Sequence, residues 1–205
     1  EALIGLIAGK AHGHSFPAKP PRSTLSAAPV LAVKNLATDK RLSDVSFALR
    51  RGEILGIAGL QGMGQLELFS ALFGMTESQG EIRVDDRPVT LTSPRDAVGA
   101  RIGIGLVPED RKTEALFLKL DGQRNVSLPV IDRYARFGLV DTAREAVDVA
   151  RIFARLEVQT RALWTSVKSF SGGNQQKIAV AKWLFANSRI LLLFDPTRGI
   201  DVGTK

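Results

Sequence analysis

The sequence contains no cysteine among its 205 residues. Disulfide bonds and thiolate metal sites are therefore excluded, and the cysteine usage fits a reducing compartment. Histidine is scarce, with His12 and His14 standing together outside any apolar pattern. Long apolar runs are missing too, because uncharged stretches such as residues 54–63 and 190–194 fall short of the roughly 20 residues of a membrane span. A soluble or peripheral protein is expected, with one sizeable core or one core and a small subdomain.

Negative charge is in short supply. The chain has 28 Lys and Arg against 21 Asp and Glu, a formal net charge of +7 and a pI near 10.0. Such a balance permits binding to nucleic acid or to an anionic membrane face. The basic residues are scattered, however, and few aromatic residues are interleaved to stack bases. We interpret the charge as a solvated basic surface and expect no nucleic-acid partner.

The first 29 residues differ from the rest of the chain. Residues 1–10 carry apolar side chains at helical spacing, and residues 16–29 form a proline-rich stretch typical of a linker. We predict that residues 1–29 are the tail of a preceding domain with its linker, and that residues 30–205 form the main domain. Because the chain lacks an initial Met and stops shortly after Asp201, we expect a fragment that is truncated at the C-terminus.

Strand and helix patterns alternate in the main domain, which predicts an α/β fold. Alternating residues at 30–33 and 45–49 favour an antiparallel β edge, and an apolar strand is expected at 54–58. Further predictions are a helix at 65–73, a hairpin of strands 80–84 and 89–91 around residues 85–88, a strand at 102–107, a mostly helical subdomain at about 113–170 with its clearest helix at 141–156, a helix at 171–186, and a strand at 189–194.

A glycine-rich loop lies between the expected strand at 54–58 and the following helix. A working phosphate loop has Gly, four residues, Gly, Lys and Ser or Thr, so that backbone N–H groups, the Lys and the hydroxyl serve the phosphates and magnesium. Gly59 and Gly64 have this spacing, but Gln65 takes the Lys position and Leu66 the hydroxyl position. We predict a degenerate nucleotide-binding loop formed by Gly59, Leu60, Gln61, Gly62, Met63, Gly64, Gln65 and Leu66.

The apolar strand at 190–194 would normally end in an Asp that serves magnesium and a Glu that polarises water. Alignment on Pro196 and Thr197 puts Phe194 at the Asp position and Asp195 at the Glu position; a shift by one residue makes Asp195 the metal carboxylate and puts Pro196 at the Glu position. Either way one carboxylate is missing, so Asp195 is at best a weak catalytic candidate. Two losses that concern the same ion predict a loop that binds nucleotide through its backbone but hydrolyses it slowly, and no metal ligand is assigned.

The strongest motif is the run Ser171, Gly172, Gly173, Asn174 and Gln175 at the start of a helix. Unpaired backbone N–H groups and the positive end of the helix dipole make this an anion receptor. Ser171 is expected to cap the helix and to offer a hydroxyl, while the two glycines let a phosphate approach the backbone.

The chain resembles the second nucleotide-binding domain of the fused ATPase subunits of bacterial sugar importers, the ribose, galactose, xylose and autoinducer-2 class of ABC transporters. The resemblance is carried by residues 56–64, by 107–112, by 171–177 and by 196–203, and it covers about residues 30–205. It implies an ABC-type P-loop NTPase core with ATP and Mg²⁺ as cofactors. In that family residues 171–175 correspond to the signature segment, a name that we keep below.

Two such domains face each other head to tail in the family, so the resemblance assigns the signature segment to an ATP held by a partner domain. Glu109 takes the place of the glutamine that links nucleotide to the permease, and Asp201 matches the aspartate that communicates across the dimer. The implied partners are the first nucleotide-binding domain, the transmembrane permease and, indirectly, a periplasmic sugar-binding protein, at the cytoplasmic face of the plasma membrane. No aromatic residue occurs at 37–42 to stack adenine, and hydrolysis by the fragment alone is expected to be absent or very slow.

Two other readings stay open from the sequence. The positive charge would suit a non-transport ABC-type ATPase that acts on nucleic acid or ribosomes, although residues 107–112 and the Gln65 and Leu66 positions resemble the importers. The domain could also be a non-catalytic regulatory half, which differs from the first reading only in where the chemistry occurs.

Overall fold

The structure of the chain is a computed structural model that describes residues 28–39, 41–99 and 101–200. The predicted tail, nearly all of the linker and Asp201 lie outside these ranges. In chain order the elements are β1 (Pro29–Ala37), β2 (Val45–Arg50), α2 (Gln65–Leu72), β3 (Gln79–Val84), β4 (Arg87–Val89), α3 (Pro94–Val98), β5 (Ile104–Val107), a π-helix (Arg111–Ala115), α4 (Gly122–Ser127), a 3₁₀ helix (Leu128–Arg133), β6 (Ala135–Arg136), β7 (Leu139–Val140), α5 (Thr142–Arg155), 3₁₀ helices (Thr160–Leu163 and Val167–Ser169), α6 (Gly172–Phe185) and β8 (Ile190–Leu193).

The predicted antiparallel edge is present as a sheet with the strand order β2-β1-β3-β4. Val30, Leu31, Val33 and Leu36 of β1 are buried, and Val33 pairs with Ile82 of β3. The hairpin turn is tighter than predicted. Arg87 and Pro88 belong to β4, and the turn is made by Asp85 and Asp86 with φ of 47° and 60°. Such left-handed pairs match the twist of two-residue hairpins and are tolerated by Asp.

A second sheet consists of β5 and β8, which pair in parallel from Ile104 opposite Ile190 to Val107 opposite Leu193. Both strands are short and apolar, as expected for a parallel pair covered on its two faces. The chain connects them through the helical residues and α6, because a parallel pair needs a crossover.

The strand predicted at residues 54–58 is wrong. This segment forms no strand and is largely exposed, with Ile54 at 98% of its accessible surface. Its apolar composition favours a buried strand, but a strand also needs a neighbour that pairs with its backbone. Among the described residues β8 pairs with β5 alone, and the 54–58 segment lies across a cleft from it.

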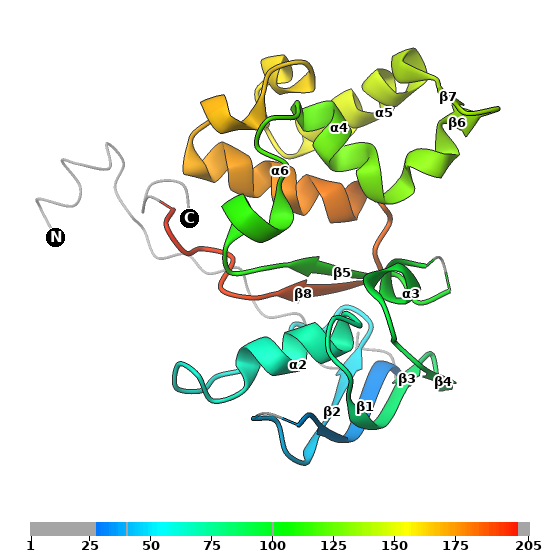
Figure 1. Cartoon of the computed structure of the whole chain (residues 1–205), viewed down its shortest axis with the longest axis vertical. Coiled ribbons are helices and arrows are strands. Elements are labelled where there is room, and N and C mark those ends of the chain that lie inside the picture. The colour runs from blue at the N-terminus through cyan, green and yellow to red at the C-terminus, as the bar shows by residue number, and fades with distance from the viewer. Residues whose placement is uncertain (1–27, 40, 100, 201–205) are drawn as a thin grey trace, which may run out of the picture.

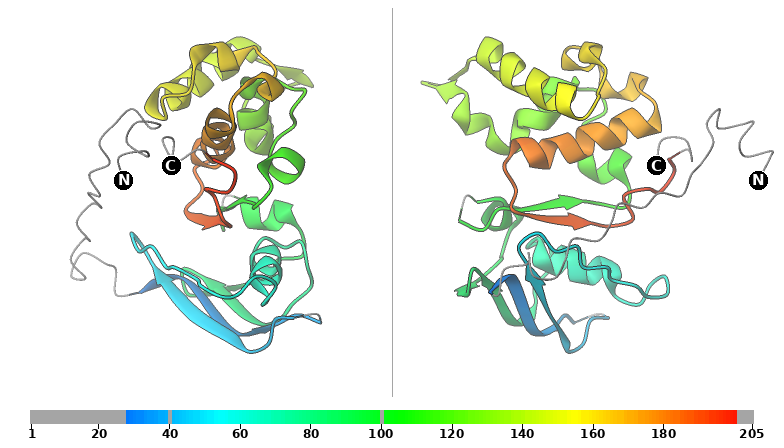
Figure 2. Two further views of the ribbon diagram at one scale, coloured as in Figure 1. Left: turned by 90° about the vertical axis from the view of Figure 1, so that its left-hand side faces the viewer. Right: turned by 180° about the vertical axis from the view of Figure 1, so that it is seen from behind.

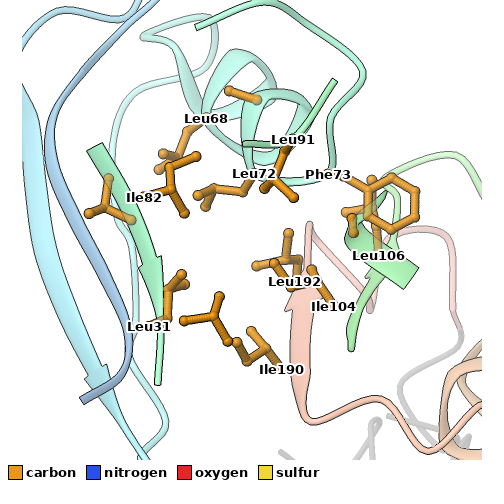
Figure 3. Close-up of a cluster of buried hydrophobic side chains, with 14 of the residues drawn as sticks. Leu31, Leu68, Leu72, Phe73, Ile82, Leu91, Ile104, Leu106, Ile190 and Leu192 are labelled. Carbon is orange, nitrogen blue, oxygen red and sulfur yellow. The ribbon is translucent and has the colours of Figure 1, made fainter. Parts of the chain in front are cut away.

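Helix α2 lies between the two sheets (Figures 1 and 2). Leu68 and Leu72 of this helix pack between Leu31 and Ile82 of the antiparallel sheet and Ile190 of β8 (Figure 3). Burial of side chains of this size stabilises the fold by about 1.5–3 kcal/mol each. The core therefore fixes α2, and with it the preceding loop, relative to the end of β8.

A second apolar cluster holds α4, α5 and α6 together on the far side of the parallel pair (Figure 1). Phe153 of α5 and Ile178 of α6 are buried in it. The helices predicted at 141–156 and 171–186 are confirmed as α5 and α6. α6 runs antiparallel to β8, so its first turn lies at the end where β5 and β8 finish (Figure 1).

Candidate functional site

The phosphate-type loop, residues 59–64, leads directly into α2. Gly62 and Gly64 have φ of 81° and 102°, a region that favours glycine, and Gly64 is the N-cap of the helix. The N–H of Met63 donates to the carbonyl of Leu60 at 3.2 Å, which folds the loop back on itself. The glycine spacing therefore has the conformational role expected of it.

The side chain of Gln65 closes this loop from within. Its Nε2 donates to the carbonyl of Leu60 at 2.8 Å, and its Oε1 accepts from the N–H of Met63 at 3.1 Å. A Cβ built on Gly59 would stand 2.6 Å from the same Nε2. The amide thus takes up a backbone donor of the kind that a bound phosphate requires, which sequence reasoning did not foresee.

The remaining side chains of the loop are exposed and mostly apolar. Leu60, Met63 and Leu66 are exposed, and Gln61 lines the adjoining cleft. Leu66 has no oxygen to offer a cation, as the sequence indicated. Apolar side chains at the mouth of a loop give no electrostatic help to a phosphate.

Arg41 is a residue that the sequence reasoning missed. Its Nη1 donates to the carbonyl of Gly62 at 3.1 Å, so a cation lies on the loop although Gln65 has replaced the Lys. The sequence contains this signal as a basic residue within residues 37–42, the segment that lacks an aromatic residue to stack adenine.

The ring of Phe194 stacks on Phe69 of α2, with centroids 5.2 Å apart. The following residue, Asp195, is exposed and has φ of 42°. Under the alignment on Pro196 and Thr197, the position that would serve magnesium is occupied by an aromatic ring; under the shifted alignment it is the exposed Asp195, and in both cases Leu66 supplies no hydroxyl. Within residues 28–39, 41–99 and 101–200 there is no cluster of three His, Cys, Asp or Glu that could hold a metal ion. For a magnesium ion at this loop, the residues offer at most the carboxylate of Asp195 and no hydroxyl.

A cleft of about 1430 Å³ adjoins the loop and is larger than the ~300–1,000 Å³ of common ligand pockets. It brings the phosphate-type loop together with Glu109 and Asp195, three predicted features that lie far apart in the sequence. The carboxylate of Glu109 forms an ion pair with Arg198. Glu109 is thus placed beside the loop as predicted, but its charge is already engaged.

The signature segment has the helix start that was predicted, with one correction. Ser171 is the N-cap residue of α6, but its hydroxyl caps no backbone N–H; it accepts from Nδ2 of Asn174 at 3.1 Å. By helix geometry the N–H groups of Gly172, Gly173 and Asn174 have no acceptor within α6, so they are available to an anion.

Gln175 fixes the first turn of α6 to the preceding 3₁₀ helix. Its side chain is buried, and Nε2 donates to the carbonyl of Val167 at 3.2 Å. The Oε1 of Gln175 and the Nε2 of Gln176 are buried without a hydrogen-bond partner among the described residues. Gln175 therefore supports the helix start rather than reaching out from it.

Fold and site together define a P-loop NTPase domain of the ATP-binding-cassette type. The profile of the ABC transporter family matches residues 42–198, and the chain belongs to this family. No helix of the described residues is long and apolar enough to cross a membrane.

The chain is 45% identical to Ribose import ATP-binding protein RbsA 1 of Rhizobium johnstonii, over the whole chain and 40% of that relative's length. It is 42% identical to the Putative ribose/galactose/methyl galactoside import ATP-binding protein 1 of Burkholderia lata, again over the whole chain and 40% of the relative. The chain thus spans about two fifths of the relatives that it matches.

Solved structures confirm the predicted fold class. CbiO1 from Clostridium perfringens, part of the ABC transporter complex cbiONQ, is similar with a TM-score of 0.68 at 22% identity, over 86% of this chain and 70% of that one. The ADP conformation of an ATP-binding cassette of an ABC transporter has a TM-score of 0.70 at 16% identity, over 86% of this chain and 72% of that one.

Proposed function

We propose that this domain is the second ATP-binding half of a sugar importer's ATPase subunit, and that its signature segment completes an ATP site on the first half. The observation that carries the proposal is the contrast between the two helix starts. α2 begins with a loop closed by Gln65, whereas α6 begins with backbone N–H groups that no neighbouring side chain occupies.

The chemical role of the signature segment follows from its groups. The N–H groups of Gly172 and Gly173 bind and orient the terminal phosphate of an ATP held by the partner half, together with the Ser171 hydroxyl. Magnesium, held by that partner site, supplies charge neutralisation for phosphoryl transfer. The loop at residues 59–64 is a weak nucleotide site without rapid turnover, because Leu66 offers no hydroxyl for the metal and the end of β8 offers a single carboxylate, Asp195, where two are needed.

The substrate class rests on the relatives, whose names specify import of ribose, galactose or methyl galactoside. We infer that the full-length protein carries a sugar of this class, with a transmembrane permease and a periplasmic sugar-binding protein as partners. It works at the cytoplasmic face of the membrane.

The experiment is ATP hydrolysis by the full-length protein with its permease in the presence of sugar-loaded binding protein. Ser171→Ala is expected to lower kcat by at least tenfold, because loss of a preorganised donor to a phosphate typically costs about 10²-fold or more. Ser169→Ala is the control, since that exposed hydroxyl two residues earlier donates only to the carbonyl of Ser166. Unchanged hydrolysis by Ser171→Ala would refute the proposed role, and hydrolysis indifferent to sugar-loaded binding protein would refute the substrate class.

A further inference from the structure

Arg111 is a buried cation that forms no ion pair with a carboxylate of residues 28–39, 41–99 or 101–200. It is 8% exposed, and none of the ion pairs among the described residues includes it. Its Nη1 donates to the carbonyl of Arg198 at 2.8 Å and its Nη2 to the carbonyl of Gly199 at 3.3 Å, while its Nε is buried and unpartnered. Burial of a guanidinium under these conditions is costly, so its position calls for a function.

The guanidinium also fills the space beside Gly172, the first residue of α6. A Cβ built on Gly172 would stand 2.6 Å from Nη2 of Arg111 and 3.3 Å from the carbonyl oxygen of Gly199. Gly172 was expected to be a glycine so that phosphate could approach. The geometry adds a second cause: any larger residue would collide with Arg111.

The segment that carries Arg111 is attached to α6 at both ends. The π-helix begins at Arg111, beside the first turn of α6, and ends at Ala115, whose carbonyl accepts a hydrogen bond from buried Lys182 of α6. Arg198 adds a further link, because its side chain forms an ion pair with Glu109 and its carbonyl accepts a hydrogen bond from Arg111. Residues 109–111, the turn at 198–199 and the start of α6 are thus held as one unit.

The charge of Arg111 favours an anion at this place. A cation beside the N-terminal end of a helix is unfavourable for the helix itself, because the dipole is positive there. The same cation strengthens the positive potential in front of the helix, where the free N–H groups of the signature segment lie.

We propose that Arg111 is a positioning residue that sets the signature segment and the 198–199 turn in the geometry needed to contact the partner's phosphate. This inference rests on the proposed function. The planar fork is essential, because its two Nη groups reach two successive carbonyls while it lies against Gly172. Arg111 acts through these neighbours and does not itself touch the nucleotide.

The test uses the full-length protein and the variants Arg111→Ala, Arg111→Lys, Gly172→Ala and Arg111→Ala/Gly172→Ala. Arg111→Ala is expected to lower kcat for ATP hydrolysis by about 10- to 100-fold, since small misplacements cost rates of this order. KM for ATP should change by less than threefold, because the nucleotide is held by the other half. Arg111→Lys keeps the charge but not the fork and should recover less than half of the wild-type kcat. Arg151→Ala, on the exposed face of α5, is the control and should keep the wild-type kcat.

The double variant is the most discriminating of these tests. Gly172→Ala should lower kcat by at least tenfold in the wild-type background and by a clearly smaller factor once Arg111 is Ala, because the collision with Nη2 has been removed while the approach of phosphate and the nearby Gly199 carbonyl remain. An equal cost in both backgrounds would overturn the inference, as it would mean that Gly172 serves the phosphate alone. Wild-type kcat in Arg111→Lys would overturn it too.

A readout without nucleotide separates positioning from simple loss of folding. Amide hydrogen exchange in Arg111→Lys should be faster at residues 172–175 and 196–200 and unchanged in α5. Faster exchange throughout the chain would contradict the inference, and so would unchanged exchange at these two segments. Ser171→Ala tests the proposed function separately, and that function fails if this variant keeps the wild-type kcat. If Ser171→Ala lowers kcat but Gly172→Ala lowers kcat by the same factor with and without Arg111, only the role of Arg111 is refuted.

Discussion

Phe69 of α2 and Phe194 at the end of β8 stack almost parallel, with ring centroids 5.2 Å apart and an interplanar angle of 16°. The pair attaches the helix behind the phosphate-type loop to the residue that follows β8.

A double-mutant cycle should measure this contact. Phe69→Leu and Phe194→Leu are each expected to destabilise the protein, and to show a coupling of about 1 kcal/mol, because stacked aromatic pairs contribute roughly 0.5–1.5 kcal/mol beyond area burial. Chemical denaturation of the four proteins measures it. Phe137→Leu, at the exposed β6–β7 hairpin, is the control partner for Phe194→Leu, and that pair should be additive. A coupling near zero between Phe69 and Phe194 would mean that the rings do not support each other.

Removal of the Gln65 amide should open the phosphate-type loop. Gln65→Ala removes one of the two acceptors of the Met63 N–H, which keeps only its 3.2 Å hydrogen bond to the carbonyl of Leu60, so ATP binding at this loop is expected to tighten about three- to tenfold, the worth of roughly one hydrogen bond. Titration with ATP, in a full-length protein whose first half cannot bind nucleotide, checks this. Gln79→Ala, which removes an exposed amide at the start of β3 outside this cleft, should leave the affinity unchanged. Weaker binding by Gln65→Ala would indicate that this amide contacts the nucleotide rather than competing with it.

Local signals explain what the sequence could predict. Glycines at 62 and 64 are needed for left-handed backbone, and the apolar spacing of α5 defines a buried face whatever surrounds it. The phosphate-type loop, the signature helix and the antiparallel edge were therefore predictable. The absence of a strand at 54–58 could not be predicted, because a strand depends on a paired neighbour as well as on apolar composition.

The missed parts of the site all depend on contacts between distant residues. Arg111 reaches carbonyls 87 and 88 residues further along the chain, and Arg41 reaches Gly62 across 21 residues. In the sequence each is one basic residue among 28. In the sequence Gln65 indicates only that the Lys is missing. The folded loop shows that its amide bonds to the N–H of Met63 and the carbonyl of Leu60.

Asn125 is expected to be essential for the helical residues above the parallel pair. It is fully buried; its Oδ1 accepts from the N–H of Phe117 at 2.8 Å, and its Nδ2 donates to the carbonyls of Phe117 and Asp121. Asn125→Leu should lower the free energy of unfolding by about 2–4 kcal/mol, because several buried backbone groups lose their partners at once. Gln159→Leu, the same kind of change at an exposed amide, should stay within about 0.5 kcal/mol of wild type. A cost below about 1 kcal/mol for Asn125→Leu would show that water or a shift of the 117–121 loop satisfies these groups.

The stability of the protein should depend on Lys182 in the alkaline range. Burial lowers the pKa of Lys182 from 10.5 to about 8, and its ammonium donates to the carbonyl of Ala115. Because the folded pKa lies below the unfolded one, the unfolded chain binds more protons between pH 8 and 10.5, and stability rises with pH across that window. The cost of the buried charge is fully present below about pH 8 and fades as the pH approaches 10.5. The free energy of unfolding of the wild type, relative to that of Lys182→Met, should therefore increase by about 2 kcal/mol between pH 7.5 and 9.5. Lys168 is exposed and lies in the 3₁₀ helix before α6. The difference in free energy of unfolding between wild type and Lys168→Met should stay constant over this pH range. A difference between wild type and Lys182→Met that stays constant with pH would mean that Lys182 keeps its ordinary pKa in the folded protein.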